Sequence, residues 1–254
     1  MVEATTYGVP TWVDLSVPDV QAAARFYEGL LGWTIEAHGS PVGDYYIGTI
    51  GGHEVGGMMA APPQDAGMPA TWTVLFNVAD VDAIVRTVAD AGGRIVEQPF
   101  DLPDARIAIV ADPTGALFGV VSGPTSPGAW LSSAPGAVCW VELLTRDPRA
   151  AISFYASVFG WHASTGTVGD VRYTTFTLGG ELVAGAMTMP DEVPSELSAV
   201  WSVSFAVEDC TVSERRATEL GGQVVKPTTP VGEGRFAVLE DPQGTTFQVM
   251  DQRR

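Results

Sequence analysis

The chain has 254 residues, and its 30 acidic and 13 basic side chains give it a formal net charge of −17. Such an acidic surface argues against nucleic acids and anionic membranes as partners, because both attract basic protein surfaces. No apolar run reaches the roughly 18 residues of a membrane span, and the N-terminal sequence lacks the regions of a signal peptide, so we expect a cytoplasmic protein.

The first elements along the chain are a strand, a helix and three further strands. Residues 11–17 predict a strand, Asp19 is placed to cap the helix that follows, and Gly32 is placed to end it. Three strand-like runs come next, at residues 33–37, 45–50 and 54–60. The glycine pair between the last two runs suits a tight hairpin, because both residues tolerate positive φ.

A second module then shows the same order of elements. Residues 71–78 predict a strand, Asp80 starts a helix that ends near Gly92, and further strands lie near Ile95, Ile107 and Phe118. The sequence Asp112-Pro113-Thr114-Gly115 fits a type I turn before the last strand. A stretch rich in Gly, Pro, Ser and Ala follows, and we interpret residues 125–136 as a linker.

The second half of the chain repeats the first. Trp12, Asp14, Phe26-Tyr27 and Gly32-Trp33 return 128 positions later as Trp140, Glu142, Phe154-Tyr155 and Gly160-Trp161. Asp112-Pro113 returns 129 positions later as Asp241-Pro242. We therefore predict an α+β fold of four strand-helix-three-strand (βαβββ) modules in two tandem domains, at residues 1–124 and 137–254.

This order of elements, with its Phe-Tyr, Gly-Trp and Asp-Pro-x-Gly motifs, resembles the vicinal oxygen chelate superfamily. That superfamily includes glyoxalase I, bleomycin-resistance proteins and extradiol dioxygenases. The tandem layout is similar to actinobacterial proteins often labelled hydroxylases. The resemblance implies two glyoxalase-like domains with half-open β cups, whose inner faces carry metal ligands in many members.

The resemblance also implies four metal-ligand positions in each domain, and this sequence departs from that pattern. The matching residues are Trp12, Gly57, Thr73 and Gly119 in the first domain and Trp140, Gly185, Ser202 and Gln248 in the second. Of these side chains, only that of Gln248 could coordinate a metal, and the hydroxyls of Thr73 and Ser202 are poor ligands, since catalytic divalent ions prefer imidazole or carboxylate. We therefore expect no metal and no cofactor.

Asp14 and Glu142 are the candidate catalytic residues. Each lies two positions after a tryptophan on a predicted strand, so it faces the same side as Trp12 or Trp140. A carboxylate on an apolar wall has a raised pKa and can act as a general base. The alternative is a structural role, in which backbone groups or Arg106 and Arg235 pair with these acids.

Aromatic and polar side chains near the predicted cup mouths are candidates for binding a planar ligand, although strand aromatics also build cores. They are Trp12, Tyr45, Tyr46, Met58, Trp72 and Thr73 in the first copy and Trp140, Tyr173, Trp201, Ser202 and Gln248 in the second. The histidines at 38, 53 and 162 are expected at the surface. The two cysteines, Cys139 and Cys210, suggest neither a disulfide framework nor a catalytic thiol.

Three functions stay open at this level. The leading interpretation is metal-free binding of a small, planar organic metabolite, for sequestration or in secondary metabolism. The second is a cofactor-independent hydroxylase, isomerase or cyclase with Asp14 or Glu142 as base. The third is a metal-dependent lyase or dioxygenase with displaced ligands. A monomer and a homodimer are both compatible with the sequence.

Overall fold

The computed structural model describes residues 6–40, 43–61, 70–123, 134–169, 171–190, 193 and 199–252. The elements of the first half are β1 (Pro10–Val17), α1 (Val20–Leu31), β2 (Thr34–Ser40), β3 (Gly43–Ile50), β4 (His53–Ala60), β5 (Thr71–Asn77), α2 (Val81–Asp90), β6 (Arg94–Asp101), β7 (Arg106–Ala111) and β8 (Leu117–Ser122). Most of the predicted linker, up to residue 133, lies outside the described residues.

The second half repeats this order of elements. They are β9 (Val138–Thr145), α3 (Pro148–Phe159), β10 (His162–Val168), β11 (Val171–Leu178), β12 (Glu181–Thr188), β13 (Ala199–Ala206), α4 (Cys210–Glu219), β14 (Gln223–Val231), β15 (Gly234–Glu240) and β16 (Thr246–Gln252). The described residues thus contain four βαβββ modules, as the sequence predicts.

The helix ends follow the predicted signals. The Asp19 side chain accepts a hydrogen bond from Ala22 N–H, and Gly32 ends α1 with a φ of 72°. In α3 the Asp147 side chain caps the first turn with Pro148 next to it, and Gly160 ends the helix, again with a φ of 72°. Glycine suits both ends because left-handed backbone there costs it no steric strain.

Each half of the chain forms an eight-stranded sheet. The strand order is β2-β3-β4-β1-β5-β8-β7-β6 in the first and β10-β11-β12-β9-β13-β16-β15-β14 in the second. The pairs β1–β4, β5–β8, β9–β12 and β13–β16 are parallel, whereas the three strands that follow each helix pair antiparallel in sequence order. The two sheets therefore share one topology.

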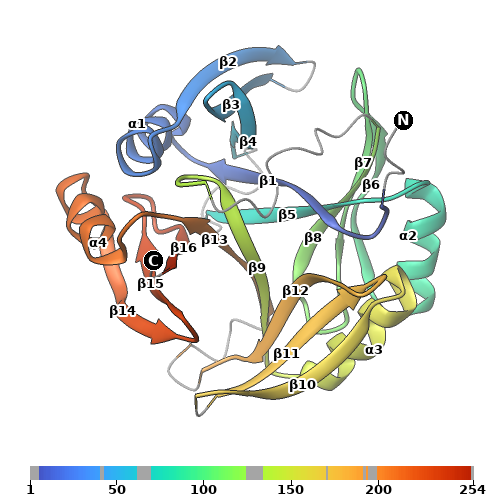
Figure 1. The fold of residues 1–254 in the computed structure, drawn as a ribbon. Helices are drawn as coiled ribbons and strands as arrows, with labels where there is room; N and C mark the ends of the chain where they lie inside the picture. Colours follow the sequence, from blue (N-terminus) through green and yellow to red (C-terminus); the bar gives the residue numbers. More distant parts are fainter. Residues whose placement is uncertain are drawn as a thin grey trace, which may run out of the picture. The chain divides into compact units, whose positions relative to one another are not determined.

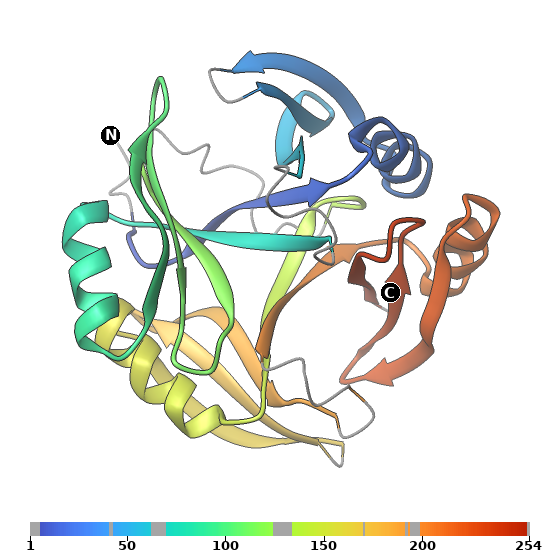
Figure 2. The same ribbon diagram turned by 180° about the vertical axis from the view of Figure 1, so that it is seen from behind.

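The compact units of the chain do not coincide with its two repeats. One unit, here the α1/α4 unit, holds α1 and β2–β4 of the first copy with α4 and β14–β16 of the second. The other, the α2/α3 unit, holds α2 and β6–β8 with α3 and β10–β12. Strands β1, β5, β9 and β13 give residues to both units. Figure 1 shows α1 beside α4 and α2 beside α3, and Figure 2 shows the same pairs from behind.

An aromatic cluster around Tyr27 of α1 forms the core of the α1/α4 unit. Trp33, Trp72, Phe205 and Phe247 contact the Tyr27 ring, with centroid separations of 5.3 to 6.5 Å. All five side chains are buried. Residues from both copies thus build one core, and aromatic pairs of this kind add to the free energy gained from burying their area.

The α2/α3 unit repeats this core around Tyr155 of α3. Phe118, Trp161, Phe176 and Trp201 lie at centroid separations of 5.2 to 6.1 Å from the Tyr155 ring. The Trp161 indole N–H also donates to the Gly8 carbonyl at 2.7 Å. The repeated Phe-Tyr and Gly-Trp motifs are therefore core residues.

The Asp-Pro-x-Gly turns bind the helix of the other copy within each unit. Asp112 accepts hydrogen bonds from two backbone N–H groups of its own turn and from the Tyr155 hydroxyl at 3.1 Å. Asp241 makes the matching bonds, including one from the Tyr27 hydroxyl at 3.2 Å. Both aspartates are buried, so these bonds satisfy charged groups inside the protein.

Among the described residues, no helix is long and apolar enough to cross a bilayer.

Candidate functional site

Trp12, Asp14 and Tyr45 meet on one face of the first module. The Trp12 indole N–H lies 2.9 Å from Asp14 Oδ1 and 2.8 Å from the Tyr45 hydroxyl oxygen. The Tyr45 hydroxyl in turn donates a very short hydrogen bond to Asp14 Oδ1. We call these three residues the Asp14 cluster. Each of the three residues is partly exposed.

Gly57 makes room for this cluster. In the parallel β1–β4 pair, Asp14 lies opposite Gly57. A Cβ atom at position 57 would overlap the Tyr45 hydroxyl and crowd Asp14 Oδ1. The missing side chain therefore lets the tyrosine reach across the strand to the carboxylate.

The surroundings raise the pKa of both Asp14 and Tyr45. Burial raises the pKa of Asp14, against the hydrogen bonds from Tyr45 and Trp12, which lower it. Burial, together with the charge of Asp14, raises the pKa of Tyr45 well above its usual value. Tyr45 therefore stays protonated and donates at neutral pH, while Asp14 can take up a proton at higher pH than an exposed carboxylate.

The second copy carries a matching pair in the α2/α3 unit. The Tyr173 hydroxyl donates to Glu142 Oε2 at 3.1 Å, and Glu142 lies opposite Gly185 in the β9–β12 pair. Glu142 is 7% exposed. Trp140 lies two residues earlier on β9 and is partly exposed. The tyrosine–carboxylate pair is thus a property of both repeats.

Ser202 and Gln248 are also brought together. Gln248 Nε2 donates to Ser202 Oγ at 3.3 Å, and Ser204 Oγ donates to Gln248 Oε1 at 3.3 Å. Ser204 was not singled out from the sequence, although its two-residue spacing from Ser202 puts it on the same strand face. Thr73 is partly exposed on β5. A Cβ at Gly119 would press against the Leu75 side chain, so apolar packing occupies that position.

Four candidate ligand-binding residues lie away from the Asp14 cluster: Tyr46, Met58, Trp72 and Trp201. The Tyr46 hydroxyl accepts a hydrogen bond from Gln21 of α1 at 2.9 Å, so Tyr46 lies on the helix side of its sheet. Met58 is fully buried, and Trp72 and Trp201 donate to the core tyrosines Tyr27 and Tyr155. Successive strand residues face opposite sides, so Tyr46 and Met58 cannot share a face with Tyr45 and Gly57. Their positions favour packing over ligand binding.

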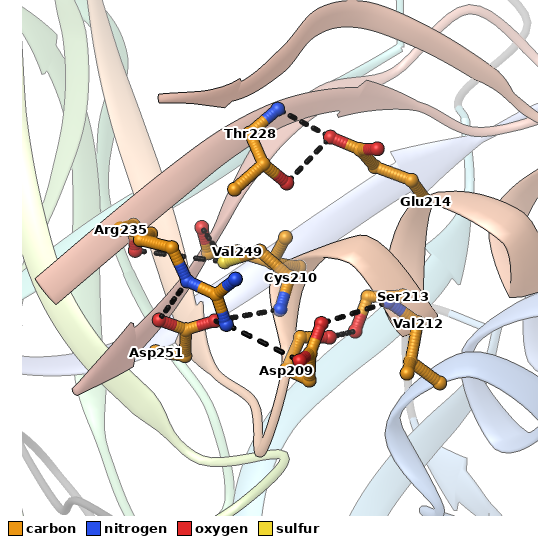
Figure 3. Close-up of polar contacts among 9 residues, drawn as sticks. All are labelled: Asp209, Cys210, Val212, Ser213, Glu214, Thr228, Arg235, Val249 and Asp251. Atoms are coloured by element: carbon orange, nitrogen blue, oxygen red, sulfur yellow. Dashed lines mark hydrogen bonds and ion pairs between the residues drawn. The ribbon is translucent and has the colours of Figure 1, made fainter. Parts of the chain in front are cut away.

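The two arginines do pair internally, but not with the predicted carboxylates. Arg106 binds Asp82 at 2.8 Å and Asp101 at 2.7 Å. Arg235 binds Asp251 at 2.6 Å and Asp209 at 3.2 Å, as Figure 3 shows. The suggested pairing of Arg106 and Arg235 with Asp14 and Glu142 is therefore wrong, because acids nearer to each arginine neutralise it.

Neither thiol is poised for chemistry. Burial raises the pKa of Cys139 and of Cys210 to about 12 in each case. The Cys210 thiol donates to the carbonyls of Arg235 and Val249 at 3.5 Å, inside the network of Figure 3. Both thiols are therefore protonated at neutral pH, whereas a nucleophile needs the thiolate.

Comparison with known proteins identifies the family. The model of the Glyoxalase/Bleomycin resistance protein/Dioxygenase superfamily matches residues 10–120, and that of a Glyoxalase-like domain matches residues 140–250. The chain belongs to the glyoxalase/bleomycin resistance/dioxygenase superfamily. The α+β fold with two tandem glyoxalase-like domains is thereby confirmed.

Relatives within the superfamily include proteins of similar length. CFP32 of Mycobacterium tuberculosis, provisionally named a glyoxylase, is 38% identical over 96% of this chain and 94% of its own length. The anthracycline biosynthesis protein DnrV of Streptomyces peucetius is 38% identical over 97% of this chain and 94% of its own length.

Solved structures of the superfamily share the fold at low sequence identity. The Mn(II)-bound glyoxalase of Novosphingobium aromaticivorans has a TM-score of 0.63 at 17% identity, over 98% of this chain and 83% of its own. The 2,3-dioxygenase LapB of Pseudomonas sp. KL28 has a TM-score of 0.65 at 16% identity, over 98% of this chain and 94% of its own.

The residues of this chain do not fit the metal that many superfamily members use. The implied ligand positions hold tryptophan, glycine, hydroxyl and amide side chains, of which the amide of Gln248 is bound by serines. In the described part of the chain, no three His, Cys, Asp or Glu side chains gather to hold an ion. The three histidines are exposed. These side chains are therefore poorly suited to hold a catalytic divalent metal.

Proposed function

We propose that this protein binds a small, planar organic metabolite without a catalytic metal, either to sequester it or to serve a secondary-metabolic pathway. The observation that carries the proposal is the Asp14 cluster, in which tryptophan stands at the usual first-ligand position and a tyrosine–carboxylate pair lies beside it. An indole ring offers a stacking surface, and the paired oxygens offer directional hydrogen bonds.

The names of two relatives support the class of ligand. DnrV, and DauV of Streptomyces sp. strain C5, are anthracycline biosynthesis proteins, and each is covered by this chain over 94% of its length. Anthracyclines are planar polycyclic compounds with phenolic and quinone oxygens. A phenolic hydroxyl of such a compound suits Asp14 or Glu142, whose carboxylate oxygens accept hydrogen bonds.

The test is titration of the protein with a dihydroxyanthraquinone, in which the quenching of tryptophan fluorescence reports binding. We expect saturable binding, and we expect Asp14→Asn and Glu142→Gln each to weaken it. Where the carboxylate accepts a hydrogen bond from the phenol, the affinity should fall about tenfold, because hydrogen bonds to charged groups are worth about 1.5–3 kcal/mol. Asp104→Asn removes an exposed acid and serves as the charge-matched control. If the double variant Asp14→Asn/Glu142→Gln binds as tightly as the natural chain, the proposal is wrong.

Binding at the Asp14 cluster should also depend on pH. The charged carboxylate is the stronger acceptor, and burial raises the pKa of Asp14. Affinity is therefore full above this raised pKa and falls as the pH drops through it, starting at a higher pH than for an exposed aspartate.

A second candidate function is a cofactor-independent hydroxylase, isomerase or cyclase that uses Asp14 or Glu142 as base. The favouring observation is the burial-raised pKa of Asp14, because a carboxylate with a raised pKa is suited to accept a proton as a general base. Turnover of a bound metabolite that Asp14→Asn and Glu142→Gln abolish would support this enzyme. Binding without turnover would leave the sequestration role.

A further inference from the structure

A cavity of about 210 Å³ lies in the α2/α3 unit, where the first turn of α3 faces β10–β12. Its walls combine the apolar residues Ile152 and Ala186 with two basic ones, Arg149 and Arg172. We call it the Arg149 cavity. Its helix-side position separates it from the face that carries the tyrosine–carboxylate pair, because Thr174 and Tyr173 point to opposite sides of β11.

The first copy of the repeat shows why this space is open. There Tyr46 pairs with Met58 across β3 and β4, and in the second copy Thr174 pairs with Ala186 across β11 and β12 in the same register. Met58 is fully buried, and Tyr46 is anchored by Gln21. The large side chains of Tyr46 and Met58 in the first copy are thus replaced by the small ones of Thr174 and Ala186 in the second. The volume that the larger side chains would fill is the cavity.

The charge of the cavity wall also differs between the two copies. Arg149 replaces Gln21, and Arg172 replaces Asp44, so two side chains without positive charge become two guanidinium groups. Neither guanidinium pairs with a carboxylate within the described residues, although the whole chain has 30 acids for 13 bases. Both arginines are exposed, and among the described residues they bring two positive charges to a cavity wall that holds one carboxylate, Asp147, which favours an anionic ligand.

The nearest polar groups of the wall are already satisfied. The Asp147 carboxylate also lines the cavity, but its Oδ1 atom accepts the backbone N–H groups of Arg149 and Ala150 at 3.1 and 3.0 Å. The Thr174 hydroxyl is bonded to that of Thr165 at 2.9 Å. The arginines are therefore the groups available to a ligand.

We propose that the Arg149 cavity binds a small aromatic carboxylate. The ring takes the space that Tyr46 and Met58 fill in the first copy, and the carboxylate pairs with Arg149 and Arg172. Guanidinium groups recognise carboxylates through paired, charge-assisted hydrogen bonds. A volume below the roughly 300–1,000 Å³ of drug-sized sites suits a single ring.

The test adds the full chain to fluorobenzoate and observes the fluorine NMR signal of this probe. We expect saturable line broadening with fluorobenzoate and none with the neutral fluorobenzamide. Arg149→Gln/Arg172→Gln should weaken binding at least about tenfold, since charged hydrogen bonds are lost. Thr174→Tyr/Ala186→Met rebuilds the packing of the first copy and should abolish binding.

Controls keep the outcome clear. Arg94→Gln removes an exposed arginine of β6 and should leave fluorobenzoate binding unchanged. Melting curves of all variants establish that they fold. Absence of saturable binding, or equal binding by a folded Thr174→Tyr/Ala186→Met variant, overturns the proposal. Its failure is separate from that of the metabolite proposal, whose test varies Asp14 and Glu142.

Discussion

At the scale of single residues, a glycine controls how closely Asp14 and Tyr45 approach. Gly57 leaves the space through which the tyrosine hydroxyl reaches the carboxylate. The Trp12 indole N–H lies within hydrogen-bonding distance of both Asp14 Oδ1 and the Tyr45 hydroxyl oxygen. A position that looks like a lost metal ligand in the sequence is therefore a packing requirement of the pair that replaces it.

Gly57→Ala should accordingly destabilise the protein and separate Tyr45 from Asp14. We expect a loss of about 1–3 kcal/mol in the free energy of unfolding, the usual cost of forcing an extra methyl group into packed surroundings. Urea unfolding measures it. Gly39→Ala on β2 is the matched control, because a Cβ there meets nothing within 4 Å. Equal stability of the two variants would refute the close-approach argument.

At the scale of elements, the Asp-Pro-x-Gly turns connect the repeats. The turn between β7 and β8 binds α3 through Asp112 and Tyr155, and the turn between β15 and β16 binds α1 through Asp241 and Tyr27. The motif resembles an ordinary hairpin turn in the sequence, since nothing local indicates that its aspartate accepts a bond from a distant helix. The structure thus gives a repeated turn a long-range role.

Asp112→Ala should therefore cost more stability than a typical turn substitution. It leaves the Tyr155 hydroxyl and two backbone N–H groups without their acceptor, and each unsatisfied buried group costs about 1–3 kcal/mol. We expect a loss of at least about 3 kcal/mol in urea unfolding. Asp104→Ala, at an exposed site, should change stability little. A loss under about 1 kcal/mol for Asp112→Ala would contradict the long-range role.

At the scale of the whole molecule, the repeat made much of the fold predictable. The module order, helix caps and tandem domains follow from residues such as Asp19, Gly32 and the 128-residue period. The grouping of modules into compact units does not follow from the sequence, because modules with the same order of elements offer similar apolar faces to either copy. Their packing depends on side-chain fit between residues far apart in sequence, such as Tyr27 with Phe247.

The candidate site was predictable in part for a similar reason. The sequence located Asp14, Tyr45 and their second-copy counterparts, since the period aligns them. It grouped Tyr46 and Met58 with them, although neighbouring positions on β3 and on β4 face opposite sides of the sheet. The ion pairs of Arg106 and Arg235 depend on which acids lie nearest in space, which a single sequence does not specify.

Elemental analysis of the untagged protein, combined with native mass spectrometry of the same sample, tests the metal-free binding role most directly. We expect no stoichiometric divalent metal, because the ligand positions of the superfamily hold Trp12, Trp140 and other side chains that bind such ions poorly. A copurified planar metabolite would identify the ligand. Stoichiometric zinc, nickel, iron or manganese would contradict this role and favour a lyase or dioxygenase with displaced ligands.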